Sequence, residues 1–433
     1  LLGNDETGMN YKANVYHFRQ DSSFLYYTGI DRAGLAAIID TDSGATTLIG
    51  TELTMDDVVW TGPMPSLRDA ADLSGIEYVA DWSKATGLLG NGPTHYLPIY
   101  RGDHAFKIAD VLGISPREAK EKHSETLIRA VIAQRAYKTD EELVELDRAV
   151  ALTNDIHVAA MRIARPGLTE AEVHAEIQRV VNAADSHLSF PAIVTVNGQT
   201  LHNHYHHNPL EPGQMLLVDA GGESAMRYAG DMTRTFPVDP MFTLRQKEVY
   251  EVCLQSQLDA IEALKPGVAY KDVHLLAAKT IATGLTEIGL MKGDPEAAVA
   301  AGAHALFFPH GLGHMMGLDV HDMEGLGENY VGYDDAVQRS DQFGLAFLRL
   351  GRALQPGFVI TVEPGIYFIP ELIDMWAAEK RHAEFLNYEA IDSYKDFGGI
   401  RIEDDFVITT NGSRLLGGDV PKTVADVEAI REG

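Results

Sequence analysis

Cysteine is almost absent from this chain, whose 433 residues include only Cys253. A single thiol excludes an internal disulfide framework, a zinc site built from cysteine pairs and a CxxC redox motif. Cys253 lies in the apolar pattern of an expected helix, so we predict a core residue there and not a nucleophile. The scarcity of cysteine fits a reducing compartment, and we expect a cytoplasmic protein.

Basic residues are also few. The chain has 35 lysines and arginines and 63 aspartates and glutamates, which gives a formal net charge of -28. A protein that binds nucleic acid needs a basic stripe on its surface. Here the basic residues form only short clusters, such as Lys120 and Lys122. We therefore expect no nucleic-acid partner, and we interpret the acidity as a solvated surface.

Long hydrophobic runs are missing as well. No stretch reaches the roughly 18 consecutive apolar residues of a membrane-spanning helix, although 45% of the residues are hydrophobic. We therefore expect no membrane insertion. The length exceeds what one hydrophobic core usually supports, so two domains are expected.

The first third of the chain alternates strand and helix patterns. Apolar stretches at 34–40 and 46–50 flank a turn signal, which predicts a hairpin. Residues 116–138 combine charge with apolar positions at helical spacing, which predicts a helix between domains. We therefore predict two domains, residues 1–137 with this helix included and residues 138–433.

The second region contains helices with clear ends. A helix is predicted at about 140–164, and capping-box patterns at Thr169 and Thr243 begin two others. Pro-Gly followed by Val-His occurs at 166–174 and again at 266–274, an offset of one hundred residues. This pattern indicates either a duplicated half-domain with a site between the halves or a coincidence of common helix ends, and both remain open.

Five residues of the types that bind metals are spread over the last half of the chain. They are Asp219, Asp231, His314, Glu363 and Glu403. Four carboxylates and one imidazole form an oxygen-rich set, which suits two hard divalent cations that share a bridging water in metal-assisted hydrolysis. The set predicts an enzyme.

Asp219 ends a strand pattern that begins at Met215, and 226–236 is the expected return strand across a turn at 221–225. The two aspartates, Asp219 and Asp231, would then be neighbours across a hairpin. Their separation of twelve requires an odd-length loop or a bulge if both are to point to one face. Close carboxylates repel, and a cation relieves the repulsion. Two unrelated surface aspartates are the alternative.

His310 and His314 would share one face of a helix, as in zincins, but the glycines at 311 and 313 disfavour a helix and no glutamate follows His310. A loop or strand whose backbone approaches a ligand fits better. His321 completes three histidines within twelve residues, which favours a functional site over a structural one.

Glu363 and Glu403 occupy strand patterns where apolar residues would be expected. A buried carboxylate needs a partner, which metal ions or Arg401 could provide, whereas edge-strand glutamates would face water. Histidines also crowd 202–207, as a nonspecific metal-binding tract or, as we prefer, a polar loop that lines a pocket.

The motifs HGLGHMMGLDVHD, TVEPGIYF and GIRIEDD, taken together and in this order, resemble those of the pita-bread metallopeptidases, specifically the prolidase and aminopeptidase P group. The resemblance covers about Lys138 to the C-terminus, with a fainter match before it. It implies an α+β fold, in which a pita-bread catalytic domain follows a smaller α/β domain. It also implies two metal ions, usually manganese with cobalt or zinc as alternatives, a proline-containing peptide substrate and a homodimer.

The resemblance also implies roles for individual residues. The five candidates above match the family's metal ligands, with Asp231 and Glu403 expected to bridge the ions, and Asp219 and Asp231 lie one residue further apart than is usual. Glu363 would move a proton from the attacking water to the leaving nitrogen. His204, His310 and His321 resemble histidines that orient substrate and stabilise the tetrahedral intermediate, whereas His202, His206 and His207 have no clear counterpart.

Two arginines complete the expected site. Arg349 resembles the arginine that prolidases use on a dipeptide's carboxylate, and Arg401, with the hydroxyl of Thr233, resembles a residue that supports the metal ligands. The stretch of about forty residues between Glu363 and Glu403 resembles a segment of prolidases.

Three functions therefore compete. Hydrolysis of Xaa-Pro dipeptides is favoured, and release of the N-terminal residue from longer Xaa-Pro peptides is the alternative. A creatinase-like enzyme or a noncatalytic binding protein is disfavoured, because all five ligands are present.

Overall fold

The computed structural model describes residues 1–90, 92–418 and 420–432. Contacts divide the chain into two compact units, Leu1–Ala133 and Gln134–Gly433. The domain boundary between residues 137 and 138 stays a prediction. None of the described helices is both long and apolar enough to cross a membrane.

The first unit contains a three-stranded sheet of order β1-β2-β3, formed by β1 (Ala36–Ile39), β2 (Thr46–Gly50) and β3 (Tyr78–Asp81). Strands β1 and β2 are antiparallel with Ile39 opposite Thr46, so the predicted hairpin is confirmed. The parallel strand β3 follows a helical connection. The helices are α1 (Ser22–Thr28), α2 (Met55–Thr61), α3 (Leu67–Leu73), α4 (Ala85–Leu88), α5 (Gly102–Leu112) and α6 (Pro116–Glu121). Helix α7 (Glu125–Arg135) begins in the first unit and ends in the second.

The predicted single helix over 116–138 is wrong, because the structure divides it into α6 and α7. Lys122 ends α6, and Ser124 begins the next helix by accepting hydrogen bonds from the backbone N–H groups of Leu127 and Ile128. A serine that caps a helix N-terminus replaces the missing intrahelical acceptor and so permits a new start.

The second unit surrounds its strands with helices. The strands are β4 (Ile193–Thr195), β5 (Met215–Ala220), β6 (Met232–Pro237), β7 (Val359–Val362), β8 (Gly365–Tyr367), β9 (Gly399–Arg401), β10 (Asp404–Ile408) and β11 (Ser413–Leu415). They form sheets of order β4-β5-β6, β11-β10-β7 and β8-β9. The helices are α8 (Asp140–Ile163), α9 (Glu170–Ala183), α10 (Leu244–Ala263), α11 (Tyr270–Glu287), α12 (Pro295–Ala301), α13 (Glu328–Gly332), α14 (Pro370–Glu379), α15 (Tyr388–Asp392) and α16 (Val424–Glu432).

Local chemistry accounts for the helix starts that the sequence predicts. Both predicted capping boxes are present, Thr169 with Glu172 at α9 and Thr243 with Gln246 at α10. In each box the threonine hydroxyl and the side chain of the third helical residue accept hydrogen bonds from backbone N–H groups that have no helical partner. Cys253 lies on α10 with none of its surface exposed, so the predicted core position is confirmed.

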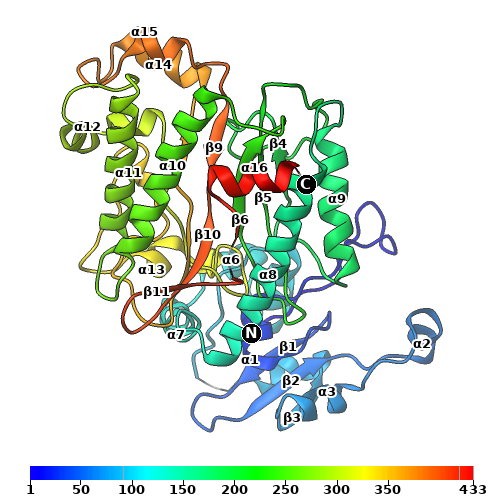
Figure 1. The fold of residues 1–433 in the computed structure, drawn as a ribbon. Helices are drawn as coiled ribbons and strands as arrows, with labels where there is room; N and C mark the ends of the chain where they lie inside the picture. Colours follow the sequence, from blue (N-terminus) through cyan, green and yellow to red (C-terminus); the bar gives the residue numbers. More distant parts are fainter. Residues whose placement is uncertain (91, 419, 433) are drawn as a thin grey trace. The chain divides into compact units, whose positions relative to one another are not determined.

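The two Pro-Gly segments have the same local structure. Gly167 joins α8 to α9 and Gly267 joins α10 to α11, with φ angles of 92° and 86°. Their N–H groups donate to Leu210 and Leu354, each a few residues before a strand, β5 or β7. Figure 1 shows α10 and α11 on one side of strands β6, β9 and β10, with α8 and α9 on the other. A helix pair followed by strands therefore occurs twice, as α8 and α9 before β4 to β6 and as α10 and α11 before β7 to β11. We call these the first and second halves of the unit, and their strands lie side by side.

Candidate metal centre

Asp219 and Asp231 lie on one face of the β5–β6 hairpin. Asp219 is opposite Thr233, and Asp231 lies two residues before Thr233, so strand alternation points both carboxylates to the same side. The pairing continues without a bulge to a loop at 225–227, where Arg227 has a left-handed φ of 69°. The predicted odd-length loop is confirmed, but the turn lies beyond 221–225 and the two aspartates are diagonal neighbours.

His314 belongs to an extended segment that runs beside β7. The Thr361 N–H donates to the His314 carbonyl at 3.1 Å, and the Glu363 N–H donates to the Leu312 carbonyl at 2.8 Å. A Cβ on Gly313 would lie 2.2 Å from the Thr361 carbonyl oxygen. The rejection of a zincin helix is therefore confirmed, but glycine is needed here for contact with a neighbouring strand and not with a ligand.

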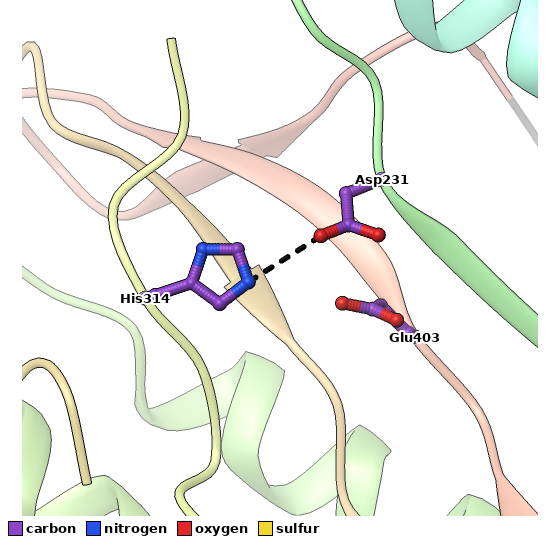
Figure 2. Close-up of side chains that lie close together, drawn as sticks. All are labelled: Asp231, His314 and Glu403. Carbon is purple, nitrogen blue, oxygen red and sulfur yellow. Dashed lines mark ion pairs between the residues drawn. The ribbon is translucent and has the colours of Figure 1, made fainter. Parts of the chain in front are cut away.

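Three of the five candidates form a compact cluster. Potential ligand atoms of Asp231, His314 and Glu403 all lie within 4.8 Å of one another, and the three residues are buried. Figure 2 shows these side chains pointing toward a common centre, with His314 Nε2 3.3 Å from Asp231 Oδ2. Glu403 reaches the cluster because its N–H donates to the Thr233 carbonyl, which joins the second half of the unit to β6.

The other two candidates flank this cluster. Glu363 Oε1 lies 3.5 Å from His314 Nε2. Asp219 Oδ2 accepts a hydrogen bond from Arg401 at 2.6 Å, but its Oδ1 is buried without a hydrogen-bond partner among the described residues. All five residues line one cavity of about 620 Å³.

The electrostatics of these carboxylates match a cation site. Burial raises the pKa of Asp231 well above its ordinary value, and the charge of Asp219 adds to this. Burial likewise raises the pKa of Glu403, with further repulsion from Asp231 and Glu363. Buried like charges are stabilised by a cation between them, so the oxygen-rich donor set fits divalent metal ions.

The state of His314 also fits a ligand. Its Nδ1 lies 3.0 Å from the Met315 carbonyl oxygen, which places the proton on Nδ1 and leaves the lone pair of Nε2 toward Asp231 and Glu363. Burial lowers the pKa of His314, which favours the neutral imidazole. A neutral ring oriented by a carbonyl is the form that binds metals.

Arg401 is buried and supports the cluster through all three of its nitrogens. They donate to Asp219 Oδ2 at 2.6 Å, Thr233 Oγ1 at 3.0 Å and the Tyr367 hydroxyl at 2.8 Å. Thr233 donates in turn to Glu403 Oε2 at 2.6 Å. Tyr367 was not predicted from the sequence, where its position in TVEPGIYF was the only signal. The network fixes the orientation of two carboxylates.

The predicted histidines lie at the same cavity but differ in their contacts. His310 Nε2 is 2.9 Å from the Tyr367 hydroxyl, and burial lowers the pKa of His310 to about 3, so its ring is neutral. The His321 ring packs edge-on against His314, with centroids 4.3 Å apart. His204 is exposed and lines the cavity, and so does His202, for which the sequence predicted no role.

The remaining histidines of the tract contact other groups. His206 stacks on His174, with centroids 4.3 Å apart, and its Nε2 lies 3.1 Å from the Ala192 carbonyl oxygen. His207 packs against Tyr205. Neither ring is among the cavity lining, so only part of the tract forms the predicted polar wall.

Arg349 lines the cavity within a group of charges. Its Nε lies 3.1 Å from Glu324 Oε2 and 3.5 Å from Glu328 Oε1. The same Glu324 oxygen lies 2.5 Å from His321 Nδ1. Glu324, at the start of a short 3-10 helix (Glu324–Leu326), was not predicted, because a single glutamate carries no local signal for a role.

Comparisons with known proteins match this architecture. The family model described as metallopeptidase family M24 matches residues 145–410, and the one described as aminopeptidase P, N-terminal domain, matches residues 1–92. The Xaa-Pro dipeptidase of Homo sapiens is 34% identical over 447 residues, which cover 100% of this chain and 88% of that protein. A probable Xaa-Pro aminopeptidase of Podospora anserina is 32% identical, over 92% of this chain and 85% of that protein.

The fold is also similar to solved structures of aminopeptidase P. The aminopeptidase PepP of Pseudomonas aeruginosa has a TM-score of 0.82 at 26% identity, covering 100% of this chain and 93% of that one. Zinc-substituted E. coli aminopeptidase P in complex with product has a TM-score of 0.80 at 28% identity, with the same coverage. The chain therefore belongs to metallopeptidase family M24, as a hydrolase with a pita-bread domain preceded by an aminopeptidase P type N-terminal domain.

Proposed function

We propose that this hydrolase cleaves the peptide bond before proline and that Xaa-Pro dipeptides are its preferred substrates. The observation that carries the proposal is the buried cluster of Asp231, His314 and Glu403, flanked by Asp219 and Glu363, in a cavity that Arg349 also lines. The names of the relatives, Xaa-Pro dipeptidase and Xaa-Pro aminopeptidase, support the choice of peptide bond. We further propose a cytoplasmic homodimer.

Five residues would hold two divalent cations. They are Asp219, Asp231, His314, Glu363 and Glu403, with Asp231 and Glu403 as the proposed bridging ligands. We propose manganese, with cobalt or zinc as alternatives. Such ions, when bound, polarise a scissile carbonyl and lower the pKa of water toward neutrality.

Glu363 is the proposed proton carrier. Burial raises its pKa above the ordinary value, which suits a carboxylate that accepts a proton from the attacking water and passes it to the proline nitrogen. His321 and His204 would hold the developing oxyanion and the substrate, because both line the cavity beside the cluster. His310, held by Tyr367, would orient the substrate.

Arg349 supports the dipeptidase choice. A planar guanidinium pairs well with a carboxylate, and a dipeptide presents its C-terminal carboxylate close to the scissile bond. Release of an N-terminal residue from longer Xaa-Pro peptides is the second candidate, supported by the solved aminopeptidase P structures. A creatinase-like enzyme or a noncatalytic binding protein is disfavoured, because all five candidate ligands are present.

Metal removal tests the proposed chemistry. Dialysis against a chelator is expected to abolish cleavage of Xaa-Pro dipeptides, and manganese is expected to restore it, because the repelling carboxylates then regain their cations. The measurements are the rate of proline release and the metal content per chain. Full activity of protein shown to be free of metal would contradict the proposal.

Substrate length tests the role of Arg349. Replacing Arg349 with methionine is expected to lower kcat/KM on an Xaa-Pro dipeptide by about 10- to 100-fold, the effect of losing a charged hydrogen bond. Cleavage of the corresponding Xaa-Pro amide should change little, because it lacks the carboxylate. Arg179→Met, at an exposed position of α9, is the control. Equal losses on both substrates, or a wild-type preference for longer peptides, would favour the aminopeptidase alternative.

A further inference from the structure

We infer that Glu324 is a positioning residue, whose carboxylate holds His321 and Arg349 together in the orientations that they need at the cavity. The inference rests on the proposed function of these two residues. It links oxyanion stabilisation, assigned to His321, with recognition of the substrate carboxylate, assigned to Arg349.

A single oxygen makes both contacts. Glu324 Oε2 lies 2.5 Å from His321 Nδ1 and 3.1 Å from Arg349 Nε. His321 and Arg349 line the cavity, whereas Glu324 is not among the lining residues. Glu324, whose side chain is 39% exposed, contacts two residues that line the cavity, and we assign it a role that acts through them.

The contact determines which nitrogen of His321 is free. A carboxylate at Nδ1 requires the proton on that nitrogen, so Nε2 is the nitrogen left for another partner. The ring also packs edge-on against His314, with centroids 4.3 Å apart, which restricts its rotation. Glu324 thus selects both the tautomer and the orientation of a histidine beside the metal cluster.

The contact has a parallel consequence for Arg349. Its ion pairs with Glu324 and Glu328 are both made by Nε, at 3.1 and 3.5 Å. The two terminal nitrogens of the guanidinium are then available for a planar carboxylate. Without Glu324, the flexible arginine side chain would lose one of the two carboxylates that orient it.

The segment before Glu324 is held by buried contacts. Asp322 is buried and accepts from Arg135 at 2.6 Å and Lys138 at 2.8 Å. Met323 is 1% exposed and has a left-handed φ of 62°, a conformation that non-glycine residues seldom adopt unless their surroundings hold them. The hydrogen bond from His321 lowers the pKa of Glu324 to about 2, so this carboxylate stays ionised at neutral pH.

Kinetics of two Glu324 variants test the inference. Glu324→Ala is expected to lower kcat on both an Xaa-Pro dipeptide and the matching Xaa-Pro amide by about 10-fold, through His321. On the dipeptide alone, KM should also rise by about 10-fold, through Arg349. Glu324→Gln keeps an oxygen that can accept both hydrogen bonds, so it should retain most of the activity. Glu296→Ala, at an exposed position that pairs with Lys279, is the control.

A double-mutant cycle sharpens the KM test. If Glu324 acts on the dipeptide through Arg349, the KM effects of Glu324→Ala and Arg349→Met should not multiply in the double variant. Independent effects would overturn the inference, and so would wild-type kinetics for Glu324→Ala. Identical KM changes on the dipeptide and the amide would also overturn it.

A spectroscopic measurement separates this inference from the proposed function. Side-chain ¹⁵N NMR of the full chain should show His321 with its proton on Nδ1, assigned by comparison with His321→Gln. Glu324→Ala should shift His321 toward a mixture of tautomers, and an unchanged spectrum would overturn the inference. If the wild-type chain cleaves neither substrate, the proposed function fails, and the NMR result still decides the role of Glu324.

Discussion

Replacing Glu363 with glutamine is expected to lower kcat on an Xaa-Pro dipeptide by about 10²- to 10⁴-fold, the contribution typical of general acid–base catalysis. The Glu363 carboxylate lies beside the cluster, with Oε1 3.5 Å from His314 Nε2 and Oε2 3.8 Å from His310 Nδ1. Glutamine keeps an oxygen that can bind a cation, but it cannot accept a proton from water. Since four other ligands remain, much of the metal should stay bound.

The measurement pairs kcat at saturating substrate and manganese with the metal content per chain. Glu287→Gln, at the exposed end of α11, is a control for the loss of one glutamate charge. Unchanged turnover in Glu363→Gln would exclude the proton-carrier role. If Glu363→Gln lost activity only in proportion to its loss of bound metal, Glu363 would act as a metal ligand and not as a proton carrier.

Replacing Asp322 with alanine is expected to destabilise the second unit by about 3–5 kcal/mol, the usual effect of removing one partner of a buried ion pair. The Asp322 and Lys138 side chains are each 1% exposed, and they are 2.8 Å apart. Arg135, 3% exposed, also contacts Asp322 at 2.6 Å. In the variant, Arg135 keeps its ion pair with Asp319, but Lys138 loses the carboxylate that neutralises its charge.

Acid should reduce the difference between the wild type and Asp322→Ala. Burial alone would raise the pKa of Asp322, but Lys138 and Arg135 hold it below the ordinary value of 3.8. A carboxyl whose pKa is lower in the folded state stabilises fully above its unfolded pKa, and this contribution is lost as the pH falls through the folded value. The difference should therefore be constant from about pH 5 upward and shrink below about pH 4.

Urea unfolding at several pH values measures both effects, with Asp335→Ala as the control, because Asp335 is an exposed aspartate. A destabilisation that is the same for both variants would show that the buried pair contributes little. A difference that grows on acidification would contradict the sign of the pKa shift.

Strand alternation made the hairpin predictable from the sequence. Asp219 and Asp231 point to one face because side chains alternate along both strands, and this follows from local spacing once the loop is odd. The helix starts at Thr169 and Thr243 were predictable for the same reason, since a capping box lies within one helical turn. The turn itself was misplaced, because Gly221 and Gly222 form a turn signal within the strand pairing, whereas the observed loop at 225–227 contains no glycine, proline, asparagine or aspartate.

Contacts between distant segments could not be derived in this way. The glycine at 313 is required by the Thr361 carbonyl on a strand about fifty residues later. Arg401 reaches Asp219 across 182 positions, and Lys138 reaches Asp322 across 184. The family resemblance indicates that Arg401 supports the metal ligands, but no local pattern identifies Asp219 as its partner or marks Lys138 as buried, because both depend on the path of the whole chain.

The sequence alone therefore determined the family resemblance, the five candidate ligands and the helix and strand patterns that carry them, since all of these depend on residue type and short spacing. Only the tertiary structure decided which partner each charged side chain has. Arg401 contacts Asp219 and, through Thr233, Glu403; Lys138 contacts Asp322; and the partly exposed Glu324 contacts His321 and Arg349. The contacts of Arg401 and Lys138 arise when the two halves of the second unit fold against each other and bury these side chains, whereas the contacts of Glu324 form within the second half.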